Sequence, residues 1–308
     1  MEQVQSLSFR TLLQMTRPGF IAITLVACLL GISTAVACGH PLQVWKALAT
    51  LLLATVMHAA ANVLNDYHDA LNGADAANHE GLFPFTGGAR FIQNGHVTVE
   101  ETAQLAWTLV IVVIPCGLLL AIETGGGLIV LGLAGLFAAW AYSSPPLALM
   151  TRGWGELTVG LTWMLVVVGA DYVQRGQFFF MPWVVSLSFS LLVVNILLIN
   201  GFPDAQADAS VGKRTGVVCL GRDGATVAYG LVALMAYAWV GLGVWVFWHP
   251  EPALWGLLSI PLSCMAWVLL FKYAHQPARL KAAIVLTITA AVLHGLATMA
   301  GLLSLQIG

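Results

Sequence analysis

The chain has 308 residues, of which 59% are hydrophobic and only 8% are charged. Its mean hydropathy is +0.87, and its formal net charge at pH 7 is −2. This composition excludes a soluble globular domain and a basic nucleic-acid-binding protein, and it is typical of a chain built from membrane-spanning helices.

Apolar runs of about 20 residues, long enough to cross the hydrocarbon core of a bilayer, recur along the whole chain. In chain order they cover residues 20–38, 43–65, 102–122, 125–142, 156–172, 182–202, 225–248, 253–273 and 282–304. The sequence therefore predicts an all-α, polytopic membrane protein with nine transmembrane helices. We expect one integral-membrane domain over residues 1–308.

The basic residues predict the orientation of these helices, because cytoplasmic loops carry an excess of Lys and Arg. If the N-terminus is cytoplasmic, the loops on the external side contain only Lys46 and Arg175. The loops on the side of the N-terminus contain Arg10, Arg17, Arg90, Arg152, Lys213, Arg214, Arg222, Lys272, Arg279 and Lys281. This distribution predicts a bacterial-type inner-membrane protein with a cytoplasmic N-terminus and an external C-terminus.

The second predicted helix ends in a cluster of amides and carboxylates. Asn62, Asn65, Asp66 and Asp69 occupy positions i, i+3, i+4 and i+7, and on a helix they share one face. Carboxylates this close together in an apolar chain need a cation, and hard oxygen ligands suit Mg²⁺ that also binds substrate phosphates. The glycine-rich loop that follows supplies Arg90 as a candidate phosphate ligand.

The sixth predicted helix ends in a similar way. Asn200, Asp204 and Asp208 are spaced by four residues, and Pro203 is expected to bend or break the helix there. Lys213 and Arg214 follow in a second glycine-containing loop. The two clusters predict two Mg²⁺ sites that face each other with a diphosphate held between them.

The order of apolar helix, Asn, paired Asp and basic loop occurs twice, four helices apart. It predicts a four-helix duplication over about residues 20–142 and 156–273, with both clusters at one central cavity that opens toward the cytoplasmic side. Because the motif recurs after an even number of helices, the two units would have the same orientation in the membrane. The duplication would explain why the clusters face each other.

Further polar residues lie near the same predicted depth. The first is Arg17, another candidate for the diphosphate, and Tyr142 and Ser143 are weaker candidates that end the fourth helix. Asn195 is expected either to line the cavity or to join two helices by a hydrogen bond, and His58 is expected to be a packed residue of the bundle.

These residues resemble the UbiA superfamily of intramembrane prenyltransferases over nearly the whole chain. The resemblance is carried by Asn65-Asp66-Tyr-His-Asp69 with Asp75, by Asp204-Ala-Gln-Ala-Asp208, and by Gly212-Lys-Arg-Thr215. Gly73 occupies the position of an Asp in the hydroxybenzoate-type pattern, and Asp75 is then a candidate metal ligand. Together with Gly-Gly-Ala-Arg90 and Tyr142-Ser-Ser-Pro-Pro, this favours the dihydroxynaphthoate polyprenyltransferases of menaquinone synthesis.

The resemblance implies a Mg²⁺-dependent transfer of a polyprenyl group from its diphosphate to 1,4-dihydroxy-2-naphthoate, with loss of CO₂. The implied partners are the polyprenyl diphosphate, the aromatic acceptor and the lipid bilayer, with no nucleic acid. 4-Hydroxybenzoate, as in ubiquinone synthesis, and homogentisate are alternative acceptors. A small-molecule transporter is the alternative outside enzymes, although the charged residues gather at one surface and form no relay across the bilayer.

Overall fold

The computed structural model describes residues 8–306, and these contain helices but no strand. The ends of the predicted domain, residues 1–7 and 307–308, lie outside the described residues. The helices are α1 (Phe9–Met15), α2 (Pro18–Ala37), α3 (Val44–Asn72), α4 (Ala74–Ala77), α5 (Val99–Thr124), α6 (Gly127–Ser143), η1 (Leu149–Thr151), α7 (Gly155–Arg175), α8 (Met181–Ser210), α9 (Gly216–Trp245), η2 (Glu251–Ser259), α10 (Ile260–Tyr273), η3 (Pro277–Arg279) and α11 (Lys281–Ser304).

Within residues 8–306, eight helical segments are long and apolar enough to cross a membrane, with η2 and α10 together forming one of them. The remaining predicted span corresponds to α6, which is apolar but has only 17 residues. The prediction of an all-helical membrane protein is confirmed, whereas the count of nine spans is not. Which end of the bundle faces the cytoplasm stays a prediction from the basic residues.

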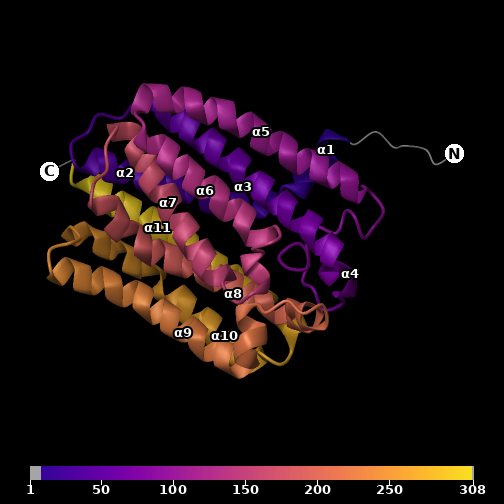
Figure 1. The fold of residues 1–308 in the computed structure, drawn as a ribbon. Coiled ribbons are helices and arrows are strands. Elements are labelled where there is room, and N and C mark those ends of the chain that lie inside the picture. Colours follow the sequence, from indigo (N-terminus) through magenta and orange to yellow (C-terminus); the bar gives the residue numbers. More distant parts are fainter. Residues whose placement is uncertain (1–7, 307–308) are drawn as a thin grey trace.

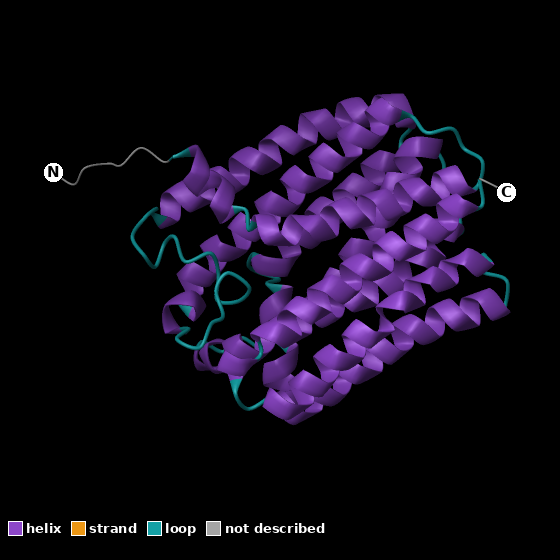
Figure 2. Ribbon diagram, turned by 180° about the vertical axis from the view of Figure 1, so that it is seen from behind, coloured by secondary structure: helices purple, strands orange, loops and turns teal. Residues whose placement is uncertain are grey.

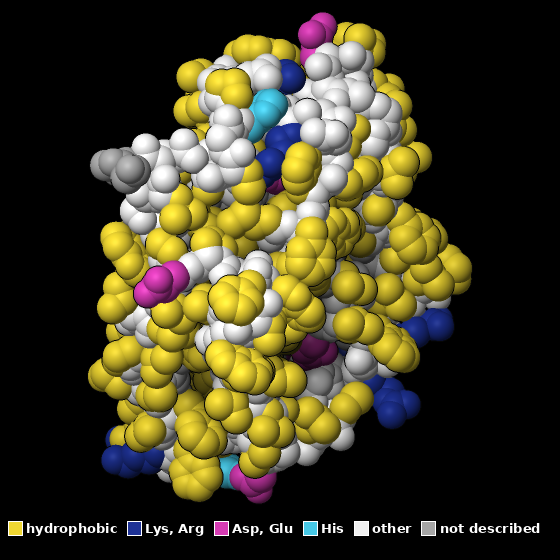
Figure 3. Space-filling view, turned by 90° about the vertical axis from the view of Figure 1, so that its left-hand side faces the viewer, with side chains coloured by type: hydrophobic (Ala, Val, Ile, Leu, Met, Phe, Trp, Pro, Cys, Tyr) yellow, Lys and Arg dark blue, Asp and Glu magenta, His cyan; other side chains and the backbone are white. Residues whose placement is uncertain are grey.

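The long helices run side by side in one bundle (Figures 1 and 2). Helix α8 packs against α7, α9 and α11, and α2 packs against α7 and α11. Their contacts form the largest apolar core, which includes Ile23, Leu30 and Phe189. Hydrophobic side chains cover most of the outer face shown in Figure 3, as expected for a surface in contact with lipid.

Both aspartate-bearing helices continue past the apolar runs that predicted them. Helix α3 extends to Asn72 and ends at Gly73 in the left-handed conformation, and α8 extends to Ser210. Of the two expectations at Pro203, a bend or a break, the break is wrong because α8 remains one helix through that residue, and the bend stays a prediction. Hydropathy detects the part of a helix that lies in lipid, but the backbone hydrogen bonds continue into polar sequence.

One end of the bundle carries α1, α4 and the long loop after α4 (Figure 1). This loop, residues 78–98, links α4 to α5. It lies at the end where α3 and α8 present their aspartates, and it makes hydrogen bonds to both helices. The fold therefore places two helix ends and one loop around the same space.

Candidate active site

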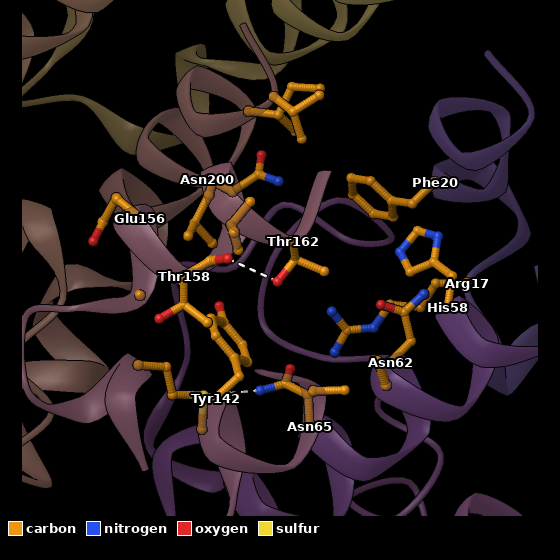
Figure 4. A pocket seen from close by; sticks show the side chains of 18 of the residues that line it. Arg17, Phe20, His58, Asn62, Asn65, Tyr142, Glu156, Thr158, Thr162 and Asn200 are labelled. Carbon is orange, nitrogen blue, oxygen red and sulfur yellow. Dashed lines mark hydrogen bonds between the residues drawn. The ribbon is translucent and has the colours of Figure 1, made fainter. Parts of the chain in front are cut away.

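A cavity of about 380 Å³ lies between α2, α3, α6, α7 and α8. Figure 4 shows that Arg17, Phe20, His58 and Asn62 lie on one side of it, and that Thr158 and Glu156 lie across from them. Ten of the residues predicted for the site line the cavity, namely Arg17, Asn62, Asn65, Asp69, Asp75, Tyr142, Asn200, Asp204, Asp208 and Lys213.

Lys213 connects the two aspartate clusters directly. Its Nζ lies 2.9 Å from Asp69 Oδ1 on α3 and 3.2 Å from Asp208 Oδ1 on α8. Burial alone would lower the pKa of Lys213, but the charges of Asp69 and Asp208 outweigh it and raise the pKa above its usual value. The cation therefore stays charged at neutral pH and compensates both carboxylates.

Arg17 has the corresponding role at the other carboxylate of α3. Its Nη2 pairs with Asp66 Oδ1, and the backbone N–H of Ala89 donates to Asp66 Oδ2 at 3.3 Å. Burial opposes the charge of Arg17, yet Asp66 and then Asp75 raise its pKa above the usual value. Asp66 does not itself line the cavity, but its partner Arg17 does.

The loop after α4 binds Asp204 of α8. Asn78 Nδ2 donates to Asp204 Oδ1 at 2.6 Å, and the backbone N–H of Gly87 donates to Asp204 Oδ2 at 3.2 Å. Together with the bond from Ala89 to α3, these contacts tie the loop to both helices. Asn78 was not predicted, because a single Asn in a polar loop carries no helical spacing that would reveal its partner.

Asp75 lies on the short helix α4 and lines the cavity, where it is buried. Burial raises its pKa to about 7, and the charges of Asp69 and Asp66 add to the effect. Gly88 packs so closely against the Asp75 carboxylate that no side chain fits there. The approach of this carboxylate thus accounts for Gly88, whereas a Cβ at Gly87 would meet Phe83 and Asn78.

Besides Asp66, three predicted residues do not line the cavity. Arg90 donates from Nη1 to the carbonyl oxygens of Asp75 and Asn78, at 2.9 and 3.1 Å, and so shapes the loop. Arg214 is exposed, and Ser143 is buried beside Met150 Sδ at 3.8 Å. Their predicted contacts to substrate stay predictions.

Several polar residues that had no predicted role, or two alternative ones, are also placed by the structure. Glu156 lines the cavity and accepts from the backbone N–H of Gly216 at 2.9 Å. A carboxylate within an apolar run is itself a signal of function. His58, which was expected to be a packed residue of the bundle, packs edge-on against Trp163 and also lines the cavity. Asn195 donates to the Tyr229 carbonyl at 3.1 Å, which is the helix–helix alternative.

The donor set fits Mg²⁺ shared with a diphosphate. Within residues 8–306, no group of three or more His, Cys, Asp or Glu side chains is arranged to hold a metal alone. Mg²⁺ needs only one or two carboxylates when waters and phosphate oxygens complete its shell. The Oδ1 atoms of Asn78 and Asn200 are buried, and neither accepts a hydrogen bond from the described residues.

The comparisons with known proteins agree with this geometry. Residues 24–303 match the UbiA prenyltransferase family. The chain belongs to the UbiA prenyltransferase family. It is 27% identical over 256 residues to the 1,4-dihydroxy-2-naphthoate octaprenyltransferase of Bacillus subtilis, which covers 82% of this chain and 79% of that relative.

Two solved UbiA homologues have the same fold. The apo structure from Aeropyrum pernix K1 has a TM-score of 0.69 and 17% identity, covering 92% of this chain and 98% of the homologue. The homologue from Archaeoglobus fulgidus bound to GPP and Mg²⁺ has a TM-score of 0.61 and 12% identity, covering 94% of this chain and 99% of the homologue. This UbiA family member is therefore a membrane-embedded prenyltransferase.

Proposed function

We propose that the protein transfers a polyprenyl group from a polyprenyl diphosphate to 1,4-dihydroxy-2-naphthoate, with decarboxylation, as a step of menaquinone biosynthesis. The observation that carries the proposal is the cavity itself. Aspartates from α3 and α8 meet at its polar end through Lys213, and apolar side chains such as Met57 and Val193 line the rest. The name of the Bacillus relative supports the choice of acceptor.

The polar end suits a diphosphate that leaves. Asp66, Asp69, Asp204 and Asp208 would hold Mg²⁺, with the amides of Asn62 and Asn65 in the surrounding shell. Bound Mg²⁺ would neutralise the charge that develops on the departing diphosphate. Because the aspartates pair with Lys213 and Arg17 here, we expect these cations to turn toward the phosphate oxygens when substrate binds.

The apolar end suits the isoprenoid tail and the cation that it forms. Loss of the diphosphate leaves an allylic carbocation, which the electron-rich ring attacks through carbon. Water would quench this cation, and side chains such as Phe20, Met57 and Trp163 line the cavity and exclude water from it. The ring carbon then releases its carboxylate as CO₂, and the aromatic ring is restored.

Product analysis by mass spectrometry tests the substrate. Purified protein receives Mg²⁺, a polyprenyl diphosphate, and 1,4-dihydroxy-2-naphthoate in competition with 4-hydroxybenzoate and homogentisate. We expect a prenylated naphthoquinol together with CO₂. If prenylated hydroxybenzoate or homogentisate is the only product, the protein belongs to another quinone pathway and the proposed mechanism is unchanged.

Substitution of the aspartates tests the site. We expect Asp66→Ala and Asp208→Ala each to abolish turnover while the protein stays folded in detergent, because each removes a carboxylate from a different helix. EDTA should inhibit the wild-type protein, and added Mg²⁺ should restore activity. Full turnover in either variant would contradict the two-cluster metal site.

A further inference from the structure

His58 is a polar residue deep in the cavity. It precedes Asp66 by eight residues on the same face of α3, which places it about 12 Å farther from the aspartate end. It lines the cavity, and Figure 4 shows its ring beside Arg17, Phe20 and Asn62. The backbone of His58 therefore lies more than two helical turns along α3 from that of Asp66.

The His58 ring is held in one orientation. Its Nδ1 lies 2.6 Å from Thr24 Oγ1 on α2, and its ring meets Trp163 on α7 edge-on, with centroids 5.3 Å apart and an interplanar angle of 89°. Nε2 has no hydrogen-bond partner among the described residues, and it is not one of the fully buried atoms that lack a partner. One ring nitrogen is thus fixed by the protein and the other is left to the cavity.

The neighbouring side chains suit a hydroxylated aromatic ring. The rings of Phe20 and Trp163 line the same part of the cavity. A free imidazole nitrogen and aromatic surfaces match a hydroxyl and a ring.

We propose that Phe20, His58 and Trp163 form the binding subsite of the aromatic acceptor, and that His58 Nε2 accepts a hydrogen bond from a ring hydroxyl. An isoprenoid tail has no group that could use a free imidazole nitrogen, whereas a hydroxylated ring does. The inference rests on the proposed function and adds the residues that select the acceptor. Nε2 is the acceptor in the tautomer whose Nδ1–H donates to Thr24 Oγ1, and this is the tautomer that we propose for His58.

This hydrogen bond would also assist the reaction. As the hydroxyl proton moves toward Nε2, electron density on the ring rises, and the carbon bearing the carboxylate forms a bond to C1 of the prenyl cation. The bond to the carboxylate then breaks, its electron pair restores the aromatic ring, and CO₂ leaves. The proton returns to the ring oxygen, so His58 ends neutral and no proton is consumed.

The test uses two ligands that differ in their hydroxyl groups, the acceptor 1,4-dihydroxy-2-naphthoate and the inhibitor 2-naphthoate. In wild type and His58→Phe we would measure KM for the acceptor, KM for the polyprenyl diphosphate, and the inhibition constant for 2-naphthoate. Loss of one hydrogen bond should raise KM for the hydroxylated acceptor about tenfold. The other two constants should not change, because neither ligand uses His58 Nε2.

A second variant covers the case in which His58→Phe does not fold. Thr24→Val keeps the imidazole and the side-chain volume but removes the group that fixes its tautomer, so it should weaken the hydroxylated acceptor selectively. His275→Phe is the matched control, because this histidine is exposed and pairs with Asp223 outside the cavity. It should leave all three constants unchanged.

Equal weakening of 1,4-dihydroxy-2-naphthoate and 2-naphthoate would overturn the proposal and make His58 a packing residue. An unchanged KM for the acceptor would overturn it as well. If wild type prenylates 4-hydroxybenzoate instead, the same comparison is run with 4-hydroxybenzoate and benzoate, so an error in the acceptor does not decide the test. If wild type turns over none of these acceptors, equilibrium binding of each ligand pair, followed by tryptophan fluorescence, decides it.

Discussion

Lys213 provides a quantitative test of how this site is held together. It is the buried cation between two helices, 2.9 Å from Asp69 Oδ1 and 3.2 Å from Asp208 Oδ1. The side chains of Lys213 and Asp69 are only 9% and 10% exposed. Lys213→Met keeps most of the side-chain volume and removes the charge, which leaves two buried carboxylates without compensation.

The size of the effect follows from these distances. At an effective dielectric constant of about 20, each contact provides about 5–6 kcal/mol of gross attraction, much of which the desolvation of the ions cancels. Breaking a buried pair by removing one partner costs about 3–5 kcal/mol net. At about 2 °C per kcal/mol for a chain of this length, Tm should fall by about 6–10 °C.

The assay is thermal unfolding of detergent-solubilised protein in EDTA and again with Mg²⁺. Mg²⁺ should stabilise Lys213→Met more than wild type, because the metal replaces the missing cation. Adding Asp208→Asn to Lys213→Met should recover much of the lost stability by removing one of the opposed charges. Lys281→Met, at an exposed lysine, should leave Tm unchanged.

Two results would refute this reasoning. One is a Tm for Lys213→Met in EDTA equal to that of wild type, which would mean that the carboxylates are neutral or separate on their own. The other is a double variant no more stable than Lys213→Met, because the loss would then come from packing and not from uncompensated charge.

Three further predictions concern groups around and away from the cavity. Asp171→Asn should cost about 3–5 kcal/mol in unfolding experiments, because it leaves Arg175 buried and unpaired; an unchanged Tm would contradict this. Gly88→Ala should reduce turnover at least tenfold through contact with the Asp75 carboxylate, whereas Gly95→Ala, which has a similar positive φ but open space around it, should lose only about 1 kcal/mol of stability. Because burial raises the pKa of Asp75 to about 7, above the value of about 3.9 in an unfolded chain, the folded state holds this proton more tightly. Stability in EDTA should therefore fall as the pH rises from about 4 to about 7, and a titration of Asp75→Asn should show a flatter profile over that range.

The sequence predicted the features that depend on local spacing. Runs of apolar residues located the long apolar helices, although not a count of nine spans, because a helix in lipid must satisfy its backbone polar groups internally whatever its neighbours are. The step of four residues between Asp204 and Asp208 placed both on one face of a helix, since helical geometry fixes that relation. The same rule predicted the shared face of Asn62 and Asp66.

The contacts between segments were decided only by the tertiary structure. No spacing in the sequence indicates that Lys213 joins Asp69 to Asp208 or that Asn78 binds Asp204. Nor does any spacing indicate that Arg90 donates to a backbone carbonyl oxygen. Each of these depends on the depth and rotation at which helices far apart in sequence pack, and on the path of the loop after α4. Hydropathy is nearly insensitive to rotation about a helix axis, so the sequence by itself determined which residues share a face, and packing decided which faces meet.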